Sequence, residues 1–434
     1  MKIGVIGGGL SGLAAAYALT KRSHRVTVWD KAPELGGQVG TFRVGGGRVE
    51  RFYHHLFRQD VELIKLIEEL GLGRRLAWLE SRVGFYRQGR LYDFVTPSDL
   101  LRFTPISLTD RLRLGLVSLY LQRSRDWRKF EGVTARDWLV HYAGRRNYEI
   151  VWRPLLEGKF GDRADEVGMV WFWSKVFIRF ASRSPGMQRE RLGYLMGSLG
   201  LLVEALSRSI REQGGDVQTS SAVRRIVTEG GRVTGVEVEG GFHPLNAVIA
   251  TVPCPTLLEL APDLPASYAS MLAGIRYQAA SCLVLVLKER LSHIYWLNIA
   301  DDQVPFPLAV EHTNFIEPAN YGGKHILYIA NYLSAESPLY GATADQLLGL
   351  YLPYLAQINP RFTREWIEDL HLFRDDAGTT IFTARYAAPD HRTPIRGLYL
   401  ANTAQSYPED RSMNVAVRLG LKVSRLVEAD ASAP

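Results

Sequence analysis

The sequence predicts an α/β protein of two domains, the first of which is assembled from parts that lie far apart in the chain. The 434 residues are too many for one ordinary hydrophobic core and suit two. A strand, a glycine-rich loop, a helix and a second strand follow one another within the first 30 residues. Strand and helix patterns of the same kind return near residue 200 and at the end of the chain, and the segments between them are richer in aromatic residues.

The loop between the first strand and the first helix has the spacing Gly7-x-Gly9-x-x-Gly12. The first glycine permits a tight turn, the second lets a pyrophosphate approach the backbone, and the third allows the helix to pack closely on the strand. Asp30 ends the second strand and offers a carboxylate to a ribose. These features together predict a Rossmann-like dinucleotide-binding domain. Its first elements are expected as a strand at 3–6, a helix at 10–20 and a strand at 25–29.

Two later parts of the chain complete this domain, so that we expect it to comprise residues 1–74, 196–262 and 376–434. The second, α+β domain then takes residues 75–195 and 263–375. In the first domain we expect a helix at 199–211, strands at 217–219, 222–228, 233–238 and 247–251, a strand at 397–401 and a helix at 413–429. In the second we expect a hairpin at 83–94, a helix at 109–122 and strands at 281–288 and 326–332.

The residues after Asp30 resemble the superfamily of flavin amine oxidases, protoporphyrinogen oxidases and phytoene desaturases. Lys31 is followed by the pair Gly36-Gly37, as in that superfamily, and Thr41 occupies the position of its usual threonine. The usual arginine is replaced by Gln38, and Arg43 is a candidate to supply the missing phosphate contact. Similarity returns in the strand that ends at Asn402, where the superfamily has Gly-Asp, and in the helix that Met413 opens.

This resemblance implies an FAD cofactor that lies extended in the first domain, with its flavin ring facing the second. The cofactor is expected to be non-covalent, because no cysteine follows Cys282 that could form the thioether of some amine oxidases. The expected cofactor-binding residues are Gly7, Gly9, Leu10, Ser11, Gly12, Asp30, Lys31, Gly36, Gly37, Gln38, Tyr53, Val223, Thr251, Asn402 and Met413.

A loop at residues 51–60 contains the candidate catalytic residues His54 and His55. The superfamily places this loop beside the flavin, and it is also similar to a histidine loop of UDP-galactopyranose mutases, although Tyr53 replaces a glycine of that loop. Histidine titrates near neutral pH and can move protons, while two hydrogen-bonded structural histidines are the alternative. His312 is a third candidate, at a strand end that faces a cavity or, as we favour slightly, in a solvated loop.

Basic residues suggest further interactions, since the net charge is +7 and the pI is about 9.3. The basic, apolar segment 109–129 fits a helix in a membrane interface, and equally a buried helix with solvated ends. Arg153 and Lys159 suggest an anionic substrate, although surface charge on a packed helix is the favoured interpretation. We expect no metal site and no nucleic-acid partner, and the sequence sets no oligomeric state.

The first hypothesis for the function is an FAD-dependent oxidoreductase that oxidises or desaturates a hydrophobic or amine-bearing small molecule by hydride transfer. A flavin-dependent, non-redox sugar-nucleotide mutase is the first alternative, and a membrane-associated FAD-binding partner protein without turnover is the second. Two cysteines, no leader peptide and no run of ~18 apolar residues favour a cytoplasmic protein, with peripheral membrane contact left open.

Overall fold

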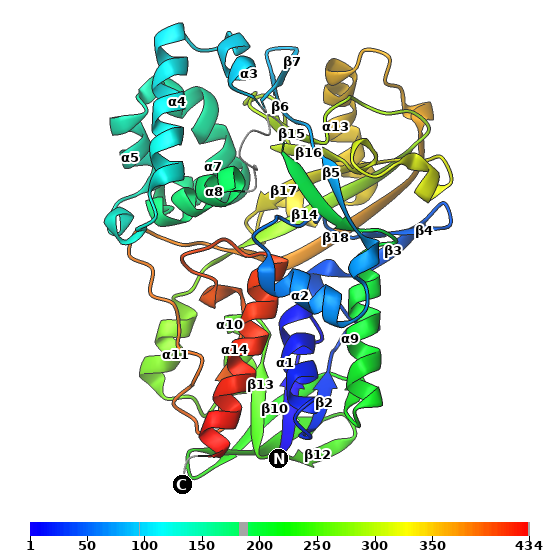
Figure 1. Ribbon diagram of the computed structural model, residues 1–434, viewed down its shortest axis with the longest axis vertical. Helices are drawn as coiled ribbons and strands as arrows, with labels where there is room; N and C mark the ends of the chain where they lie inside the picture. Colours follow the sequence, from blue (N-terminus) through cyan, green and yellow to red (C-terminus); the bar gives the residue numbers. More distant parts are fainter. Residues whose placement is uncertain (95, 182–189, 433–434) are drawn as a thin grey trace.

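A five-stranded parallel sheet forms the centre of the first domain in the computed structural model, which describes residues 1–94, 96–181 and 190–432 (Figure 1). Ile3 in its middle strand pairs with Ala247 on one side and Val26 on the other. This parallel sheet confirms the predicted Rossmann-like α/β class. In spatial order the strands are β19 (Leu398–Leu400), β13 (Ala247–Ala250), β1 (Lys2–Ile6), β2 (Arg25–Trp29) and β9 (Asp216–Gln218).

The two faces of the parallel sheet bury different partners because successive strand residues point to opposite sides. Ala247 and Ile249 pack with the helices of one face, whereas Val248 and Ala250 pack with an antiparallel sheet and two short helices on the other. On the first face lie α1 (Leu10–Thr20), α2 (Val61–Glu69), α9 (Gly200–Glu212) and α14 (Met413–Ala431). On the second lie β10 (Val223–Glu229), β11 (Arg232–Val238), β12 (Gly241–Pro244), α10 (Cys254–Leu260) and α11 (Ala266–Ala273).

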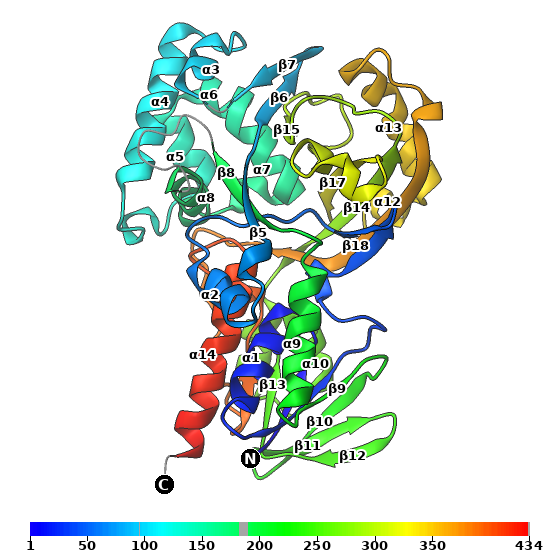
Figure 2. The same cartoon turned by 45° about the vertical axis from the view of Figure 1, so that its right-hand side comes forward.

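The second domain contains a seven-stranded mixed sheet, seen above the parallel sheet in Figures 1 and 2. Neighbouring strands are antiparallel except for β15 and β6, which run parallel. In spatial order the strands are β18 (Ile367–Thr380), β14 (Tyr277–Leu287), β17 (His325–Leu333), β16 (Leu308–Glu311), β15 (Trp296–Ile299), β6 (Val83–Arg87) and β7 (Arg90–Asp93). Two strand pairs flank it: β3 (Thr41–Val44) with β4 (Gly47–Glu50), and β5 (Leu76–Glu80) with β8 (Arg191–Leu195).

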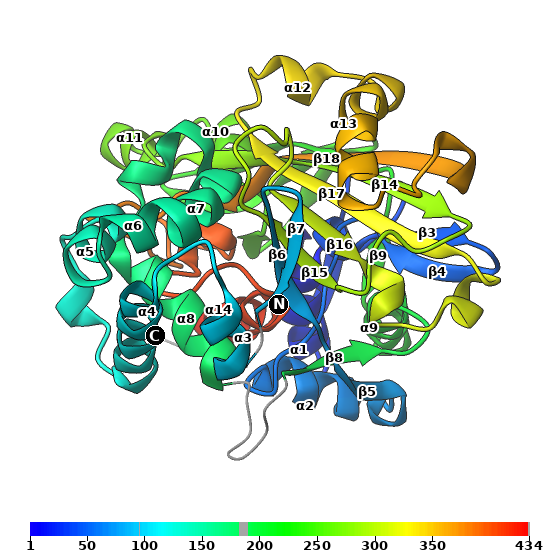
Figure 3. The same ribbon diagram turned by 90° about the horizontal axis from the view of Figure 1, so that it is seen from above.

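Helices cover this mixed sheet unevenly. Leu283 and Leu285 of β14 pack against α13 (Ala344–Ile358), beside the short α12 (Pro338–Gly341). A separate group of helices lies to one side, as the view from above shows (Figure 3). Its members are α3 (Pro97–Arg102), α4 (Leu108–Arg123), α5 (Ala135–Tyr142), α6 (Arg145–Asn147), α7 (Arg153–Phe160) and α8 (Met169–Ala181).

Helix α4 shows that one of the two interpretations of segment 109–129 is wrong. Only Leu114 and Leu121 of this helix are buried, so it is not a buried helix with solvated ends. Leu112 and Leu116 are 55% and 68% exposed. The helix therefore presents an apolar strip to solvent.

The exact domain boundaries stay a prediction. The parallel sheet does take strands from three separated parts of the chain. However, β18 runs through the expected boundary at residue 376, and Val44 and Val49 of the β3–β4 pair pack in the core of the second sheet. The two domains thus share elements where they meet.

Glu50 is a buried carboxyl group at this junction and is 1% exposed. Its Oε1 accepts a hydrogen bond from the Leu199 backbone N–H at 2.7 Å, and its Oε2 accepts one from the Tyr194 hydroxyl at 2.9 Å. Burial raises the pKa of Glu50 to about 7 from 4.5, although both hydrogen bonds oppose the shift. Between these two values the folded protein binds more protons than the unfolded chain, so its stability falls as the pH rises through this window.

We expect Glu50→Gln to remove this part of the pH dependence, which amounts to at most about 3 kcal/mol. The variant should be at least as stable as the parent at pH 8, because it buries no charge. Urea unfolding at pH 5 and pH 8 measures the difference, with the exposed Glu229→Gln as the control. An unchanged slope of the unfolding free energy with pH in Glu50→Gln would contradict the assignment.

Candidate functional site

The glycine loop lies at the carboxyl end of β1 and leads directly into α1. Gly7 has a φ of +106°, and a Cβ there would lie 2.5 Å from the Thr251 hydroxyl. A Cβ on Gly12 would lie 2.0 Å from the Gly7 carbonyl oxygen, so no side chain fits at that position. A Cβ on Gly9 would meet nothing within 4 Å. The loop is therefore packed tightly on the protein side and open at Gly9.

Helix α1 begins without a side-chain cap, since Gly9 stands at its N-cap position. Its first backbone N–H groups, at Leu10 and Ser11, therefore have the geometry that binds a phosphate at a helix N-terminus. The Ser11 hydroxyl donates a hydrogen bond to the Ala401 carbonyl at 3.0 Å, so this side chain ties α1 to the end of β19. The open cradle and the uncapped helix fit a pyrophosphate.

Asp30 is bonded to the glycine loop rather than free at the surface. Its Oδ2 accepts a hydrogen bond from the Gly8 N–H at 2.7 Å, and its Oδ1 accepts one from the Ala32 N–H at 2.8 Å. The following loop returns to the same place, because Gly36 N–H donates to the Gly8 carbonyl at 2.9 Å. A Cβ on Gly37 would lie 3.4 Å from the Gly9 Cα. Asp30, Gly36 and Gly37 thus lie against the phosphate cradle.

The other expected cofactor residues occupy different kinds of position. Thr251 donates from its hydroxyl towards the Ile6 and Gly7 carbonyl oxygens at 2.9 and 3.1 Å. Asn402 uses its amide within the protein, donating to the Val252 carbonyl at 2.8 Å and accepting from the Ala404 N–H at 3.0 Å. Of three further positions, Lys31 is exposed, Val223 begins β10, and Met413 begins α14.

Gln38 stands where the superfamily has arginine, and an arginine from elsewhere in the chain lies beside it. The Gln38 amide accepts a hydrogen bond from Arg411 Nη1 at 2.9 Å and donates one to Asp375 Oδ2 at 2.7 Å. Arg411 Nη2 also donates to the Tyr332 hydroxyl at 3.2 Å, and Tyr332 and Tyr53 share a hydrogen bond of 3.2 Å. Arg43, the replacement considered from the sequence, is exposed on β3.

A small cavity of about 20 Å³ lies at this point between the two domains. It is bounded by the histidine loop, by the middle of β14 and β17, and by the residue before the N-cap of α14. Its lining includes Phe52, Tyr53, His54, Ser281, Tyr332 and Arg411.

His54 and His55 lie together in the histidine loop, and burial lowers the pKa of both below the ordinary value for histidine. His54 Nδ1–H donates to the Phe52 carbonyl at 2.6 Å, and His55 Nδ1 shares a hydrogen bond of 3.1 Å with the Tyr295 hydroxyl. Burial, reinforced by the charge of Arg411, lowers the pKa of His54 to about 4. Burial, with nearby cations adding to the effect, lowers the pKa of His55 to about 3. Both rings are neutral at pH 7.

His312 lies in a different environment. Its side chain is 1% exposed, and its Nε2 shares a hydrogen bond of 2.7 Å with the Tyr321 hydroxyl. Burial lowers its pKa to about 3. Glu311, before it, is also buried and accepts hydrogen bonds from the Leu291 and Ser292 N–H groups. The solvated loop that we favoured is therefore wrong, and His312 packs among tyrosines instead of lining the cavity with His54.

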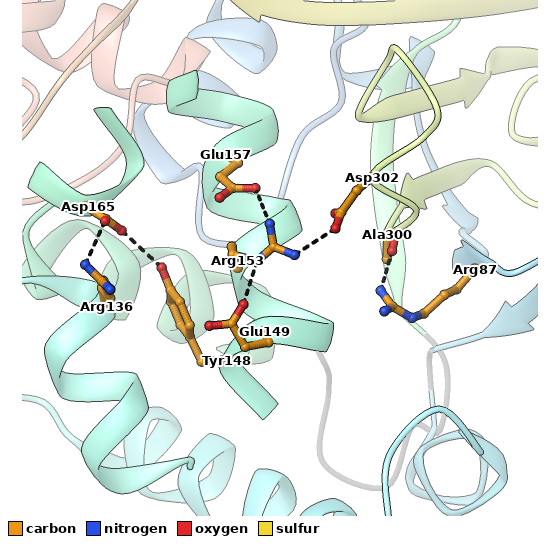
Figure 4. Close-up of polar contacts among 9 residues, drawn as sticks. All are labelled: Arg87, Arg136, Tyr148, Glu149, Arg153, Glu157, Asp165, Ala300 and Asp302. Atoms are coloured by element: carbon orange, nitrogen blue, oxygen red, sulfur yellow. Dashed lines mark hydrogen bonds and ion pairs between the residues drawn. The ribbon is translucent and has the colours of Figure 1, made fainter. Parts of the chain in front are cut away.

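The two cations of helix α7 have separate partners. Arg153 forms ion pairs with Glu149, Glu157 and Asp302 at 2.8, 2.9 and 2.9 Å, as Figure 4 shows beside the Arg136–Asp165 pair. The charge of Arg153 is therefore balanced by surface carboxylates, in agreement with the favoured interpretation of surface charge on a packed helix. For Lys159 the same interpretation is wrong, because its side chain is 16% exposed and its Nζ lies 2.5 Å from Asp410 Oδ2.

Four residues of the site were missed in the sequence, namely Lys175, Tyr332, Asp410 and Arg411. Lys175 of α8 is the second partner of Asp410 Oδ2. The available signal was the position of Asp410 and Arg411 directly before Ser412, the N-cap of the last helix. Lys175 and Tyr332 lie in elements whose sequence carries no comparable signal.

Comparison with known proteins identifies the family. The model of the flavin-containing amine oxidoreductases matches residues 10–427, and the chain belongs to that family. It is 31% identical to coproporphyrinogen III oxidase of Propionibacterium freudenreichii subsp. freudenreichii over 38% of this chain and 33% of that one. It is 24% identical to the zeta-carotene-forming phytoene desaturase of Myxococcus xanthus over 69% of this chain and 62% of the relative. The chain thus aligns with only part of the length of these curated relatives.

Solved structures share the whole fold. An oxidoreductase from Methanosarcina mazei superposes with a TM-score of 0.75 at 19% identity, covering 99% of this chain and 100% of that one. Cyclohexylamine oxidase from Brevibacterium oxydans superposes with a TM-score of 0.73 at 17% identity, covering 100% and 99%. These structures confirm the predicted fold class, and the family model confirms the predicted superfamily.

The open space at Gly9 allows a direct test of the cradle. We expect Gly9→Leu to fold, since a Cβ at this position meets no protein atom within 4 Å, but to lose bound flavin, because the side chain would fill the space next to the uncapped helix. Visible absorbance of the purified protein measures flavin content. Gly240→Leu is the matched control, because a Cβ at Gly240 also meets nothing within 4 Å. Full flavin content in Gly9→Leu would disprove the cradle.

Proposed function

We propose that the protein is an FAD-dependent oxidoreductase that oxidises or desaturates a hydrophobic or amine-bearing small molecule, with FAD held non-covalently. The observation that carries the proposal is the glycine cradle, closed on the protein side at Gly12 and open at Gly9, in a chain of the flavin-containing family. A bound flavin supplies the two-electron acceptor for a hydride from the substrate. The alternatives, a mutase and a partner protein without turnover, are less well supported by this family.

The residues of the cradle have distinct proposed roles. Backbone N–H groups at Leu10 and Ser11 would face the pyrophosphate, and Asp30 would hold the ribose next to them. The N-terminus of α14 at Met413 would face the pyrimidine edge of the flavin, where its dipole favours negative charge. Thr251 holds the glycine loop in shape through its bonds to Ile6 and Gly7.

His54 and His55 are proposed to position and hydrogen-bond the reacting molecule as neutral rings. Because the Nδ1–H of His54 donates to Phe52, its Nε2 is an acceptor. A pKa of about 4 makes that nitrogen a weak base at pH 7, so its role is orientation more than proton abstraction. His312 is proposed to support the structure, through Tyr321.

Reduction without air tests the reaction. We expect the purified protein to carry FAD that denaturation releases, and its visible absorbance to bleach anaerobically with a donor and to return when air is admitted. Amines, porphyrinogens, carotenoid precursors and sugar nucleotides form the panel of donors. Turnover of a sugar nucleotide without net flavin oxidation would establish the mutase instead. A colourless protein that FAD cannot reconstitute would rule out the proposal.

We propose a peripheral contact between an anionic membrane surface and an apolar strip that comprises the exposed strip of α4 and Leu101 of α3. No helix within the described residues is long and apolar enough to span a bilayer. The strip nevertheless exposes Leu101, Leu108, Leu112, Leu116 and Tyr120, by 50%, 57%, 55%, 68% and 50%. Exposed cations adjoin it at Arg102, Arg113, Arg123, Arg125, Arg128 and Lys129. Apolar area together with basic charge is the combination that binds anionic lipid.

Vesicle sedimentation tests this contact. We expect the protein to sediment with phosphatidylglycerol vesicles more than with phosphatidylcholine vesicles. Replacing Leu112 and Leu116 by serine together should weaken the binding by about tenfold or more, because two exposed leucines no longer enter the interface. Leu350→Ser, at a leucine that is 38% exposed on α13, is the control. Equal sedimentation of the double variant and the parent would exclude the strip.

A further inference from the structure

Positive charge is concentrated between the helical group and the start of α14. The Asp410 carboxylate is 6% exposed, and its Oδ2 is shared by the ammonium groups of Lys159 and Lys175. Its Oδ1 is buried without a hydrogen-bond partner among the described residues. One carboxylate therefore serves two cations, and both of them use the same oxygen.

The Lys175 side chain is more exposed than that of its neighbour Lys159. Its side chain keeps 46% of its accessible surface, whereas that of Lys159 keeps 16%. Protein still surrounds the ammonium closely enough that burial lowers the pKa of Lys175 to about 8, with Asp410 opposing the shift and Lys159 reinforcing it. At pH 7 the group is therefore still mainly charged, and nearly half of its side chain is accessible.

Arg411 adds a third cation from the other side of the same region. Its Nη groups bind the neutral side chains of Gln38 and Tyr332, and its Nε is buried without a hydrogen-bond partner among the described residues. Among the carboxylates, Asp410 and Asp375 favour its charged form, and Gln38 holds Asp375 in place. Three cations thus face two carboxylates, which leaves one positive charge uncompensated in this set.

The histidine loop lies within the field of these cations. Arg411 lowers the pKa of His54, and Lys175 is among the cations that lower the pKa of His55. The cavity lining places His54 beside Arg411. The positive potential therefore extends over the loop where we place the substrate, and it disfavours a protonated amine there.

Aromatic rings surround the cations. Lys159 and Lys175 lie 5.1 and 5.8 Å from the centre of the Trp171 ring, and Lys159 lies 5.7 Å from that of Tyr332. Aromatic rings beside unbalanced positive charge are complementary to a molecule that has an apolar body and an anionic group.

We propose that Lys175, supported by Lys159 and Arg411, binds an anionic group of the substrate, a carboxylate or a phosphate, so that the preferred substrate is an apolar anion and not an alkyl amine. This inference rests on the proposed function, because it specifies the substrate of that same site. Asp410 then acts as a positioning residue, because it holds the two lysines together while leaving their combined charge in excess.

Matched aromatic probes test the charge preference on the flavin-containing protein. Benzoate, phenyl phosphate, benzyl alcohol and benzylamine have the same aromatic ring. Their substituents differ in charge: the first two are anionic, the alcohol is neutral and the amine is cationic. Isothermal titration calorimetry measures their binding independently of any flavin reduction, so a failure here is distinct from a failure of the redox function. We expect at least one anion to bind about tenfold or more tightly than the alcohol and the amine. The stronger of the two anions identifies carboxylate or phosphate.

Variants of Lys175 test whether this charge preference depends on the cations of the site. Lys175→Met should weaken anion binding by about tenfold, Lys175→Arg should restore most of it, and the exposed Lys65→Met on α2 should leave it unchanged. Benzylamine binding as tightly as the anions, or no binding of either anion at millimolar concentration, would overturn the proposal. So would a Lys175→Met protein that binds the anions normally but has a shifted flavin reduction potential, because the charge would then serve the cofactor.

Discussion

The contact between Gly12 and the Gly7 carbonyl is the constraint on which the rest of the site depends. A Cβ at Gly12 would lie only 2.0 Å from that oxygen, so the first turn of α1 is pressed against the end of β1. This close approach aims the free N–H groups of the helix at the space beside Gly9. Thr251 and Gly36 then bond to the same loop from β13 and from the segment after β2. Separated parts of the chain converge on one cradle because each satisfies a backbone group of that loop.

The start of α14 has a corresponding role between the two domains. Ser412 caps the helix by accepting a hydrogen bond from the Val415 N–H at 3.1 Å. The two residues before it reach in different directions, Asp410 to α7 and α8, and Arg411 to Gln38 and β17. A short segment at the helix end thereby connects the helical group, the mixed sheet and the glycine loops.

Much of the nucleotide domain was predictable because its signals are local. The strand at 25–29 and the helix at 10–20 appear with the predicted bounds, as β2 and α1, since apolar periodicity and glycine spacing depend only on neighbouring residues. The paired strands around Gly230-Gly231 and the hairpin at Gln88-Gly89 were recognisable for the same reason. The exposure of α4 could not be predicted, because the sequence of an apolar helix does not show whether another element covers it.

The polar part of the site was harder to predict, since it depends on partners remote in sequence. Lys159 looks like surface charge until Asp410 is brought to it over a separation of 251 residues. The histidine pair was recognised by its position, but its protonation state follows from burial and from Arg411, neither of which is visible in residues 51–60. His312 was a candidate because it follows an apolar strand, but its side chain packs in the core with Tyr321.

The bond between Gln38 and Arg411 limits which residues positions 38 and 411 can hold together. The Gln38 amide oxygen accepts a hydrogen bond from the Arg411 guanidinium, so a cation from position 411 already lies beside position 38. Restoring arginine at position 38 alone would place two like charges in contact beside Asp375. An arginine at position 38 is therefore expected to occur with a neutral residue at position 411. In any set of related sequences, the residue at position 38 should therefore correlate with the residue at position 411.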